Sequence, residues 1–201
     1  MLNFLGFLGL ITISYLIGSL CSAVIVARLY RLPDPKSHGS NNPGATNMLR
    51  LAGKKYAIIV LLADGLKGFI PVFAAHLMAF PLMLQGVVAL SVTIGHIYPV
   101  FFQFKGGKGV ATALGTLWGI NAVLGASMSV LWILIALVSR YSSLASIMTL
   151  LIAPFAAIVA TKSPDAFLPL LGITTLVLYK HHANIKRLMS GEESKISFKK
   201  I

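Results

Sequence analysis

The stretch LNFLGFLGLITISYLIGSLCSAVIVA, residues 2–27, decides what class of protein this chain belongs to. It contains no charged residue and exceeds the ~20 apolar residues that a helix needs to cross a bilayer. A signal peptide has a basic beginning and a shorter apolar core, whereas this chain begins Met1-Leu2-Asn3. We therefore expect a membrane-spanning helix that stays in the protein.

Composition supports a membrane protein over the whole length. Of the 201 residues, 57% are hydrophobic and only 11% are charged, whereas soluble domains carry about 25% charged residues. The net charge of +12, from 17 Lys and Arg against 5 Asp and Glu, would suggest nucleic acid in a soluble protein. Here the basic residues flank apolar runs, so we expect the lipid bilayer as partner and no nucleic acid.

The basic residues also predict a topology. They cluster in residues 28–55, 105–108 and 180–200, and the positive-inside rule assigns all three segments to the cytoplasmic face. Between the second and third segments, the chain must then cross the membrane an even number of times. Three apolar stretches are available there, at residues 110–138, 143–160 and 166–179.

The number of crossings becomes even, four instead of three, if the first of these stretches contains two helices. It is long for one span and includes GTLWGINAVLG, residues 115–125, so we expect a break there. The prediction is an all-α integral membrane protein, a seven-transmembrane-helix bundle with one short or broken helix. Its N-terminus lies outside and its C-terminus in the cytoplasm, and residues 1–201 form a single membrane-embedded domain. The alternative has six spans and places residues 180–200 outside.

The stretch FKGGKGVAT, residues 104–112, is typical of a phosphate-binding loop. Glycines let backbone amides approach an anion closely, and the helix that follows adds its positive N-terminal end. Lys105 and Lys108 add charge. The stretch is not a Walker A loop, because Lys108 is followed by Gly109 rather than by Ser or Thr. An ordinary glycine-rich turn is the alternative.

Two further polar stretches belong to the same predicted face. HGSNNPGATN, residues 38–47, has more hydrogen-bonding side chains than a turn requires, although Thr46 and Asn47 could simply cap the next helix. In YKHHANIKRLMSGEES, residues 179–194, the spacing of His181 and Asn184 places both on one face of a helical turn.

We expect His182 and Arg187 to point away from the face that carries His181. A metal site is not expected, since no carboxylate or third histidine has ligand spacing. Asp64 and Lys67, in DGLKG within the second span, should neutralise each other, as a structural pair or as the lower lining of the site.

Several enzyme signatures are absent from the sequence. No histidine is followed five residues later by Asp, the dyad of common acyltransferases, and no G-x-S-x-G elbow occurs. The three carboxylates before the tail do not form the clustered Asp motif of CDP-alcohol transferases.

Three motifs carry a resemblance to a known family. GSNNPGATNMLR, GHIYPVFFQFKGGKGVAT and KHHANIKRL resemble, in this order, the motifs of the bacterial acyl-phosphate:glycerol-3-phosphate acyltransferases, the PlsY family. DGLKG and YSSLASI, residues 141–147, extend the similarity over most of the chain.

The resemblance implies a multi-pass enzyme of the bacterial inner membrane with a cytoplasmic active site and no cofactor. It would transfer an acyl group from acyl phosphate to sn-glycerol 3-phosphate in phospholipid synthesis. The products would be 1-acyl-sn-glycerol 3-phosphate (lysophosphatidic acid) and inorganic phosphate. A separate enzyme would have to supply the acyl phosphate.

The resemblance also implies the site residues. The catalytic set is Ser40, Lys108, His181 and Asn184. The substrate- and phosphate-binding set is Lys36, Asn42, Thr46, Asn47, Arg50, Lys105, Gly106, Gly107, Gly109, Thr112 and Ser143. The base that accepts the hydroxyl proton stays open between His181 and a phosphate oxygen of a substrate.

The chain departs from the family pattern at three positions. Asn41 replaces a common glycine, Lys36 a frequent arginine, and His182 the arginine that often follows the histidine of the third motif. The change at Asn41 should stiffen the loop.

Two other classes of protein would also carry basic and polar membrane segments. A small anion transporter needs polar residues along a path to the outer face, but the predicted outer loops AFPLM and TKSPD are poor in them. A non-catalytic assembly subunit has no reason to gather three polar loops on one face.

Overall fold

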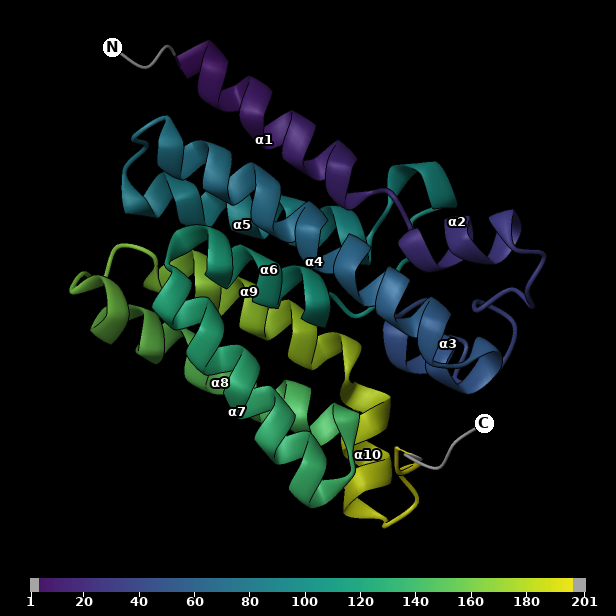
Figure 1. The fold of residues 1–201 in the computed structure, drawn as a ribbon. Coiled ribbons are helices and arrows are strands. Elements are labelled where there is room, and N and C mark those ends of the chain that lie inside the picture. Colours follow the sequence, from purple (N-terminus) through teal and green to yellow (C-terminus); the bar gives the residue numbers. More distant parts are fainter. Residues whose placement is uncertain (1–3, 197–201) are drawn as a thin grey trace.

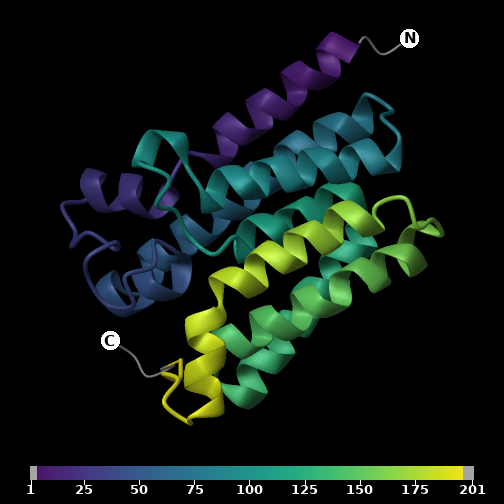
Figure 2. The same ribbon diagram turned by 180° about the vertical axis from the view of Figure 1, so that it is seen from behind.

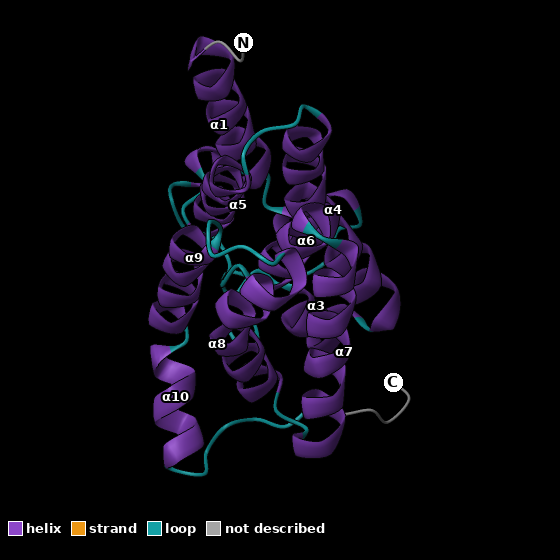
Figure 3. Ribbon diagram, turned by 90° about the vertical axis from the view of Figure 1, so that its left-hand side faces the viewer, coloured by secondary structure: helices purple, strands orange, loops and turns teal. Residues whose placement is uncertain are grey.

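The computed structural model describes residues 4–196, and over that range every regular element is a helix (Figures 1 and 3). In chain order the elements are α1 (Phe4–Gly18), α2 (Ser22–Leu29), α3 (Ala45–Ala52), α4 (Lys54–Leu77), α5 (Leu82–Ile97), a 3-10 turn (Val100–Phe102), α6 (Val110–Ile120), α7 (Ala122–Ser139), α8 (Ser142–Thr161), α9 (Phe167–Lys180) and α10 (His182–Met189). Leu2, where the first expected span begins, and Lys199 and Lys200 of the last basic segment lie outside the described residues.

Four helices are long and apolar enough to cross a membrane by themselves: α4, α5 with the turn that follows it, α7 and α8. The pair α1 and α2 also qualifies when taken together. Helices α6 and α9 are apolar but shorter. The chain is therefore an all-helical membrane protein, as the composition predicts.

The first span differs from the continuous helix that the sequence predicts. It is bent by 44° between α1 and α2, and the break exposes backbone groups that need partners in an apolar environment. Lys67 supplies one, since its Nζ donates to the Leu20 carbonyl at 2.7 Å. Ser19 Oγ accepts from the amide of Val100 at 3.3 Å. Both contacts come from segments that are distant in the sequence.

The predicted break within residues 115–125 is confirmed. Helix α6 ends at Ile120 and α7 begins at Ala122. Asn121 joins them in an extended conformation, and its Oδ1 accepts from the amide of Leu124 at 3.0 Å. The asparagine is thus the N-cap of α7, a role its short polar side chain fills well.

Helices α4 and α6 form the tightest pair in the bundle, with their backbones in direct contact. A Cβ at Gly68 would collide with the Thr112 carbonyl, and one at Gly115 would collide with the carbonyl of Gly65. Small residues permit this approach, which is how helices in lipid gain contact without a hydrophobic driving force. The pairing fixes α6, and the loop before it, against α4.

The bundle has two distinct ends (Figures 1 and 2). The start of α1 and the loops α4–α5 and α8–α9 lie at one end, whereas α3 and α10 lie toward the other. Parts of two of the three basic segments, residues 45–52 in α3 and 182–189 in α10, therefore lie toward the same end of the bundle.

The outer surface is strongly apolar, as expected for helices that contact lipid. Val138 is 87% exposed, Val159 80% and Leu168 67%. Large exposed apolar areas mark a membrane or protein interface rather than a surface in water.

Candidate active site

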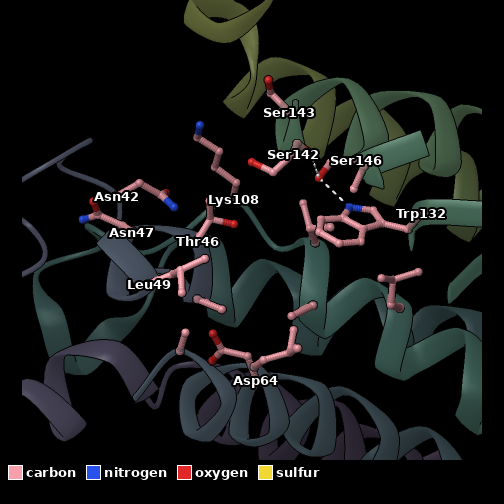
Figure 4. A pocket seen from close by; sticks show the side chains of 18 of the residues that line it. Asn42, Thr46, Asn47, Leu49, Asp64, Lys108, Trp132, Ser142, Ser143 and Ser146 are labelled. Atoms are coloured by element: carbon pink, nitrogen blue, oxygen red, sulfur yellow. Dashed lines mark hydrogen bonds between the residues drawn. The ribbon is translucent and has the colours of Figure 1, made fainter. Parts of the chain in front are cut away.

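A single large cavity of about 1260 Å³ unites the three polar stretches. Its walls come from the loop before α3 and from helices α3, α4, α6, α7, α8 and α10. Polar side chains gather at one end, where Lys108 extends toward Ser143 and faces Asn42 and Thr46 (Figure 4). The rest of the cavity is mainly apolar.

Lys108 is at the centre of the polar end. Its Nζ donates to Asn184 Oδ1. Burial lowers the pKa of Lys108 to about 8, and the carboxylate of Glu193 opposes part of that shift. Burial disfavours the charged ammonium because it loses its hydration. An anionic ligand beside Nζ would stabilise the charged form and raise the pKa of Lys108 again.

The glycine-rich loop is built differently from the predicted cradle. The amides of Gly106 and Gly107 donate to the carbonyls of Ile97 and His96, at 3.2 and 3.3 Å. Neither glycine is among the residues that line the cavity, and both amides already have partners. Lys108 and Gly109 do line it. The unpaired first-turn amides of α6 then remain as backbone donors for an anion.

Three other predicted binding residues lie away from the cavity wall. Lys105 is exposed. Lys36 donates through Nζ to the Phe102 carbonyl at 3.3 Å and packs over that ring. Thr112 is buried against α5, with Oγ1 3.1 Å from His96 Nδ1. Lys36 and Thr112 therefore contact neighbouring segments rather than the cavity.

The first polar stretch is organised by Asn47. Its Oδ1 accepts from the amide of Ser40 at 2.9 Å, and its Nδ2 donates to the carbonyls of Pro35 and His38 at 3.1 and 3.0 Å. Asn47 is 1% exposed. It lines the cavity, but its amide is committed to holding the loop.

Backbone conformation explains the departure at Asn41. Its φ is 55°, in the left-handed region, where glycine is most at ease and Asn is the side chain best tolerated. Asparagine can therefore replace the common glycine without changing the path of the loop. Gly39 also has a positive φ, and a Cβ there would collide with Asn47.

Four predicted residues of the first motif face the cavity. Ser40 and Asn42 line it from the loop, and Thr46 and Arg50 line it from α3. The last two are four residues apart, so they share one face of the helix. Arg50 Nη2 also donates to the carbonyl of Ser194 at 3.4 Å, which ties α3 to the C-terminal tail.

His181 has a defined tautomer. Its Nδ1–H donates to the Val177 carbonyl at 2.7 Å, which leaves Nε2 as an acceptor. Burial, with the charge of Lys108 as the next cause, lowers the pKa of His181 to about 4. The imidazole is therefore neutral at physiological pH and lines the cavity.

Glu193 is the main residue of the polar end that the sequence motifs do not predict. Its Oε1 accepts from Ser143 Oγ and from Asn184 Nδ2, both at 2.7 Å, and its Oε2 accepts from Arg187 Nε at 2.7 Å. Burial raises the pKa of this carboxyl, but the three hydrogen bonds outweigh it, and the pKa is lowered.

The expectation for Arg187 was wrong, because the residue lines the cavity through its ion pair with Glu193. His182 does point away, exposed, with Nδ1 bonded to the Tyr179 carbonyl at 2.9 Å. The sequence carries only a weak signal for Glu193, the polar run SGEES after the third motif.

A second ionic cluster lies below the polar end. Asp64 and Lys67 form the expected pair, with Oδ1 and Nζ 2.8 Å apart and both side chains buried. His96 Nδ1 lies 3.7 Å from the same carboxylate oxygen. Asp64 also lines the cavity from below, so both expected roles apply to this residue (Figure 4).

The apolar part of the cavity is a groove between three helices. Helix α6 contributes one stripe along its length, and the facing stripes belong to α4 and α7. The α6 stripe consists of Val110, Ala111, Leu114, Gly115 and Trp118. Trp132 of α7 lies near the polar end, where its Nε1 donates to Ser146 Oγ at 3.0 Å (Figure 4).

The arrangement suits an anionic, amphipathic ligand. Lys54, Lys108, Arg50 and Arg187 supply positive charge around the polar end, and the groove leads away from it. Across residues 4–196, no group of three or more His, Cys, Asp or Glu side chains could hold a metal ion.

The chain is similar to a set of known proteins. The family profile described as glycerol-3-phosphate acyltransferase matches residues 8–191. A glycerol-3-phosphate acyltransferase of Legionella pneumophila (strain Corby) is 49% identical over 193 residues, which cover 96% of this chain and 70% of that protein. The enzyme of the same name from Vibrio campbellii is 49% identical over 188 residues, 94% of this chain and 92% of its own.

Two solved structures share the fold. Both are of PlsY (YgiH), an integral membrane glycerol 3-phosphate acyltransferase. The glycerol 3-phosphate form superposes with a TM-score of 0.90 at 38% identity, covering 95% of this chain and 96% of that one. The lysophosphatidic acid form gives a TM-score of 0.86 at 38% identity, with 94% of each chain covered.

Proposed function

Because this chain belongs to the glycerol-3-phosphate acyltransferase family, we propose that it acylates glycerol 3-phosphate with acyl phosphate as donor. The products are 1-acyl-sn-glycerol 3-phosphate and inorganic phosphate. The observation that carries this proposal is a cluster of cations around Lys108 at the mouth of an apolar groove in a membrane protein. A donor with a phosphate head and an acyl tail matches both parts.

The polar end has donors for two phosphate groups. Two anions held close together repel each other, so the site needs cations and amide donors. Lys108 and the first turn of α6 lie on one side, and Arg50 and Arg187 line other walls. We assign Lys108 to phosphate binding and to stabilising the charge that develops on the leaving phosphate.

The reaction requires no covalent enzyme intermediate, since acyl phosphate is already an activated mixed anhydride. The glycerol hydroxyl oxygen attacks the acyl carbon, the bond between that carbon and the phosphate oxygen breaks, and phosphate leaves. Holding the two substrates in this geometry supplies much of the rate.

The destination of the hydroxyl proton follows from the chemistry of His181. A pKa of about 4 makes its imidazole a weak base, because a good general base titrates near the working pH. A phosphate oxygen, whose second pKa is about 6, is the better acceptor. We therefore assign the proton to a substrate phosphate, and we assign His181 to binding through Nε2.

The remaining roles follow from position. Ser40 and Asn184 bind the reacting groups, with Asn184 also holding Lys108. Asn42, Thr46 and Ser143 provide further polar contacts at the cavity wall. Asn47, Gly106, Gly107 and Thr112 shape the loops that carry these side chains.

The proposal includes a topology and a location. The bent pair α1–α2, the four long helices and the two shorter apolar helices together account for seven crossings by one domain, residues 1–201. The N-terminus lies outside, and the active site faces the cytoplasm at the inner membrane of a bacterium. A separate enzyme supplies the acyl phosphate.

Cysteine labelling tests the topology. In a variant without Cys21, a cysteine at Ser163 should react with an impermeant reagent added outside the cell, and one at Ser190 should not. Labelling of position 190 from outside would overturn the seven-crossing arrangement and favour six spans.

The decisive assay for the activity uses purified protein, synthetic palmitoyl phosphate and labelled glycerol 3-phosphate. Labelled lysophosphatidic acid and an equal amount of inorganic phosphate should form. Palmitoyl-CoA as sole donor should give no product. Robust turnover with the thioester would show that the assigned donor is wrong, while the family activity would stand.

A further inference from the structure

The groove has a defined far end. Its lining runs on α4 from Lys54 to Phe69, on α6 from Val110 to Trp118, and on α7 from Leu137 back to Ser129. Phe69, Trp118 and Ser129 are therefore the last lining residues of their helices, counted from the polar end. They lie at a common depth, because Gly119, next to Trp118, packs against the Phe69 carbonyl, and Trp118 is hydrogen-bonded to Ser129.

Trp118 is the largest of these three side chains, and it is held in place from two sides. Its Nε1 donates to Ser129 Oγ at 3.1 Å, which links α6 to α7 across the groove. Behind it, Gly125 of α7 lies so close that a Cβ at that position would collide with the indole. A large, rigid ring that is hydrogen-bonded and backed by a neighbouring helix resists displacement by a flexible chain.

The structure assigns to Trp118 the control of acyl-chain length: we propose that its indole is the end wall that the terminal methyl group of the acyl chain meets. This assignment rests on the proposed function. It adds a specificity determinant that lies far from the polar end, on the last turn of α6.

Selection at such a wall works by rejection rather than by attraction. The bilayer is as apolar as the groove, so a longer chain gains little by leaving lipid for protein. A chain that is too long must instead overpack the end of the groove, at a cost that corresponds to roughly 5-fold or more in rate. Chains up to the limit should react at similar rates, and longer ones should react poorly.

Leu114 offers a change in the opposite direction. It lines the groove one turn nearer to the polar end than Trp118, on the same face of α6. A larger side chain there should move the end wall toward Lys108 by about 6 Å, four residues of helical rise.

The experiment is a competition among donors. Dodecanoyl, myristoyl, palmitoyl and stearoyl phosphate are mixed in equal amounts with glycerol 3-phosphate, and the products are quantified by mass. Trp118→Ala should raise the share of the longest product relative to the shortest by about 5-fold or more. Leu114→Phe should shift the distribution toward shorter chains.

Two further variants separate chain selection from general damage. Trp118→Phe keeps most of the ring and should retain more of the wild-type distribution than Trp118→Ala. Phe155→Ala removes an aromatic side chain that is 59% exposed on α8 and outside the groove lining, and it should leave the distribution unchanged. Thermal unfolding of each variant shows whether it is folded.

The outcomes distinguish this inference from the function on which it rests. An unchanged product distribution in a folded, active Trp118→Ala protein would overturn the role of Trp118 and leave the acyltransfer intact. A wild-type protein that forms no lysophosphatidic acid from any of the four donors would instead overturn the proposed donor.

Discussion

Two clusters of charged side chains lie within the same bundle, and they differ in what their hydrogen bonds are for. In the lower cluster, Asp64 faces Lys67, and Lys67 also donates to the backbone break at Leu20. In the upper cluster, Lys108 contacts the neutral amide of Asn184, and the carboxylate of Glu193 is held by three other donors.

A structural charge in a membrane protein therefore differs from a binding charge in the partners it already has. Lys67 has an anionic partner and a backbone partner, and 6% of its surface is exposed. Lys108 faces a large cavity and has no carboxylate among its hydrogen-bond partners in the described chain. A cation that lacks a paired anion gains more from an anionic ligand than a buried cation that is already paired.

The largest expected effect is on the lower cluster. Asp64→Ala leaves Lys67 buried without its counter-ion, and breaking such a pair typically costs about 3–5 kcal/mol. Thermal or denaturant-induced unfolding of the protein in detergent should show a severe loss of the free energy of unfolding. The double variant Asp64→Leu with Lys67→Met should recover much of it, since no isolated charge remains. Wild-type stability of Asp64→Ala would show that the clusters do not differ in this way.

Removing the upper lysine should affect catalysis rather than folding. In the proposed mechanism, Lys108→Ala loses a charge-assisted bond to phosphate worth about 1.5–3 kcal/mol, so kcat/KM should fall by roughly 10- to 100-fold or more. The unfolding temperature should change little, because the lost partner is a neutral amide. Unaltered kinetics for both substrates would remove Lys108 from the mechanism.

His181 sharpens the distinction within the upper cluster. If the imidazole only binds phosphate, His181→Ala should raise KM for one substrate by about 10-fold, the loss of one hydrogen bond to a charged group, with kcat little changed. A fall in kcat of about 100-fold at constant KM would instead identify His181 as the general base. Steady-state kinetics with each substrate varied in turn separates the two results.

The smallest expected effect is a shift in pH dependence. Lys108, with a pKa of about 8, is charged below that pH and loses its proton as the pH rises through it. The proposed mechanism assigns phosphate binding to the charged form, so kcat/KM, which reports on the free enzyme, should fall above about pH 8.

Glu193→Gln provides the control for the assignment of that ionisation. The carboxylate raises the pKa of Lys108, so its neutralisation should move the alkaline limb of the kcat/KM profile to lower pH. An alkaline limb that stays in place in Glu193→Gln would mean that a different group titrates.

Much of the fold follows from the sequence, because its signals are local. Apolar runs predict the long helices, and Asn121 marks the junction of α6 and α7 through its capping side chain. The bend in the first span is different, since its contacts with Lys67 and Val100 come from elsewhere in the chain.

The site shows the same division. Lys108, His181 and Asn184 are recognisable because the motifs around them are compact. The sequence predicts that the amides of Gly106 and Gly107 are available to bind an anion, yet both donate to carbonyls at the end of α5. Glu193 enters the site because the tail folds back toward α8, a long-range arrangement that spacing alone does not encode, and there it accepts a hydrogen bond from Arg187 of α10.

The apolar groove has a consequence for how the proposed enzyme would meet its two substrates. On α4 it is lined by three leucines that are about half exposed, Leu61, Leu62 and Leu66. A donor that enters the groove from the bilayer diffuses in two dimensions, so its rate of encounter with the protein depends on its surface density in the membrane. Diluting the donor with inert lipid, at a constant bulk concentration of donor, should slow the reaction. The dependence of the rate on glycerol 3-phosphate should instead follow its concentration in the bulk solution. Membrane area therefore becomes a kinetic variable for one substrate and not for the other.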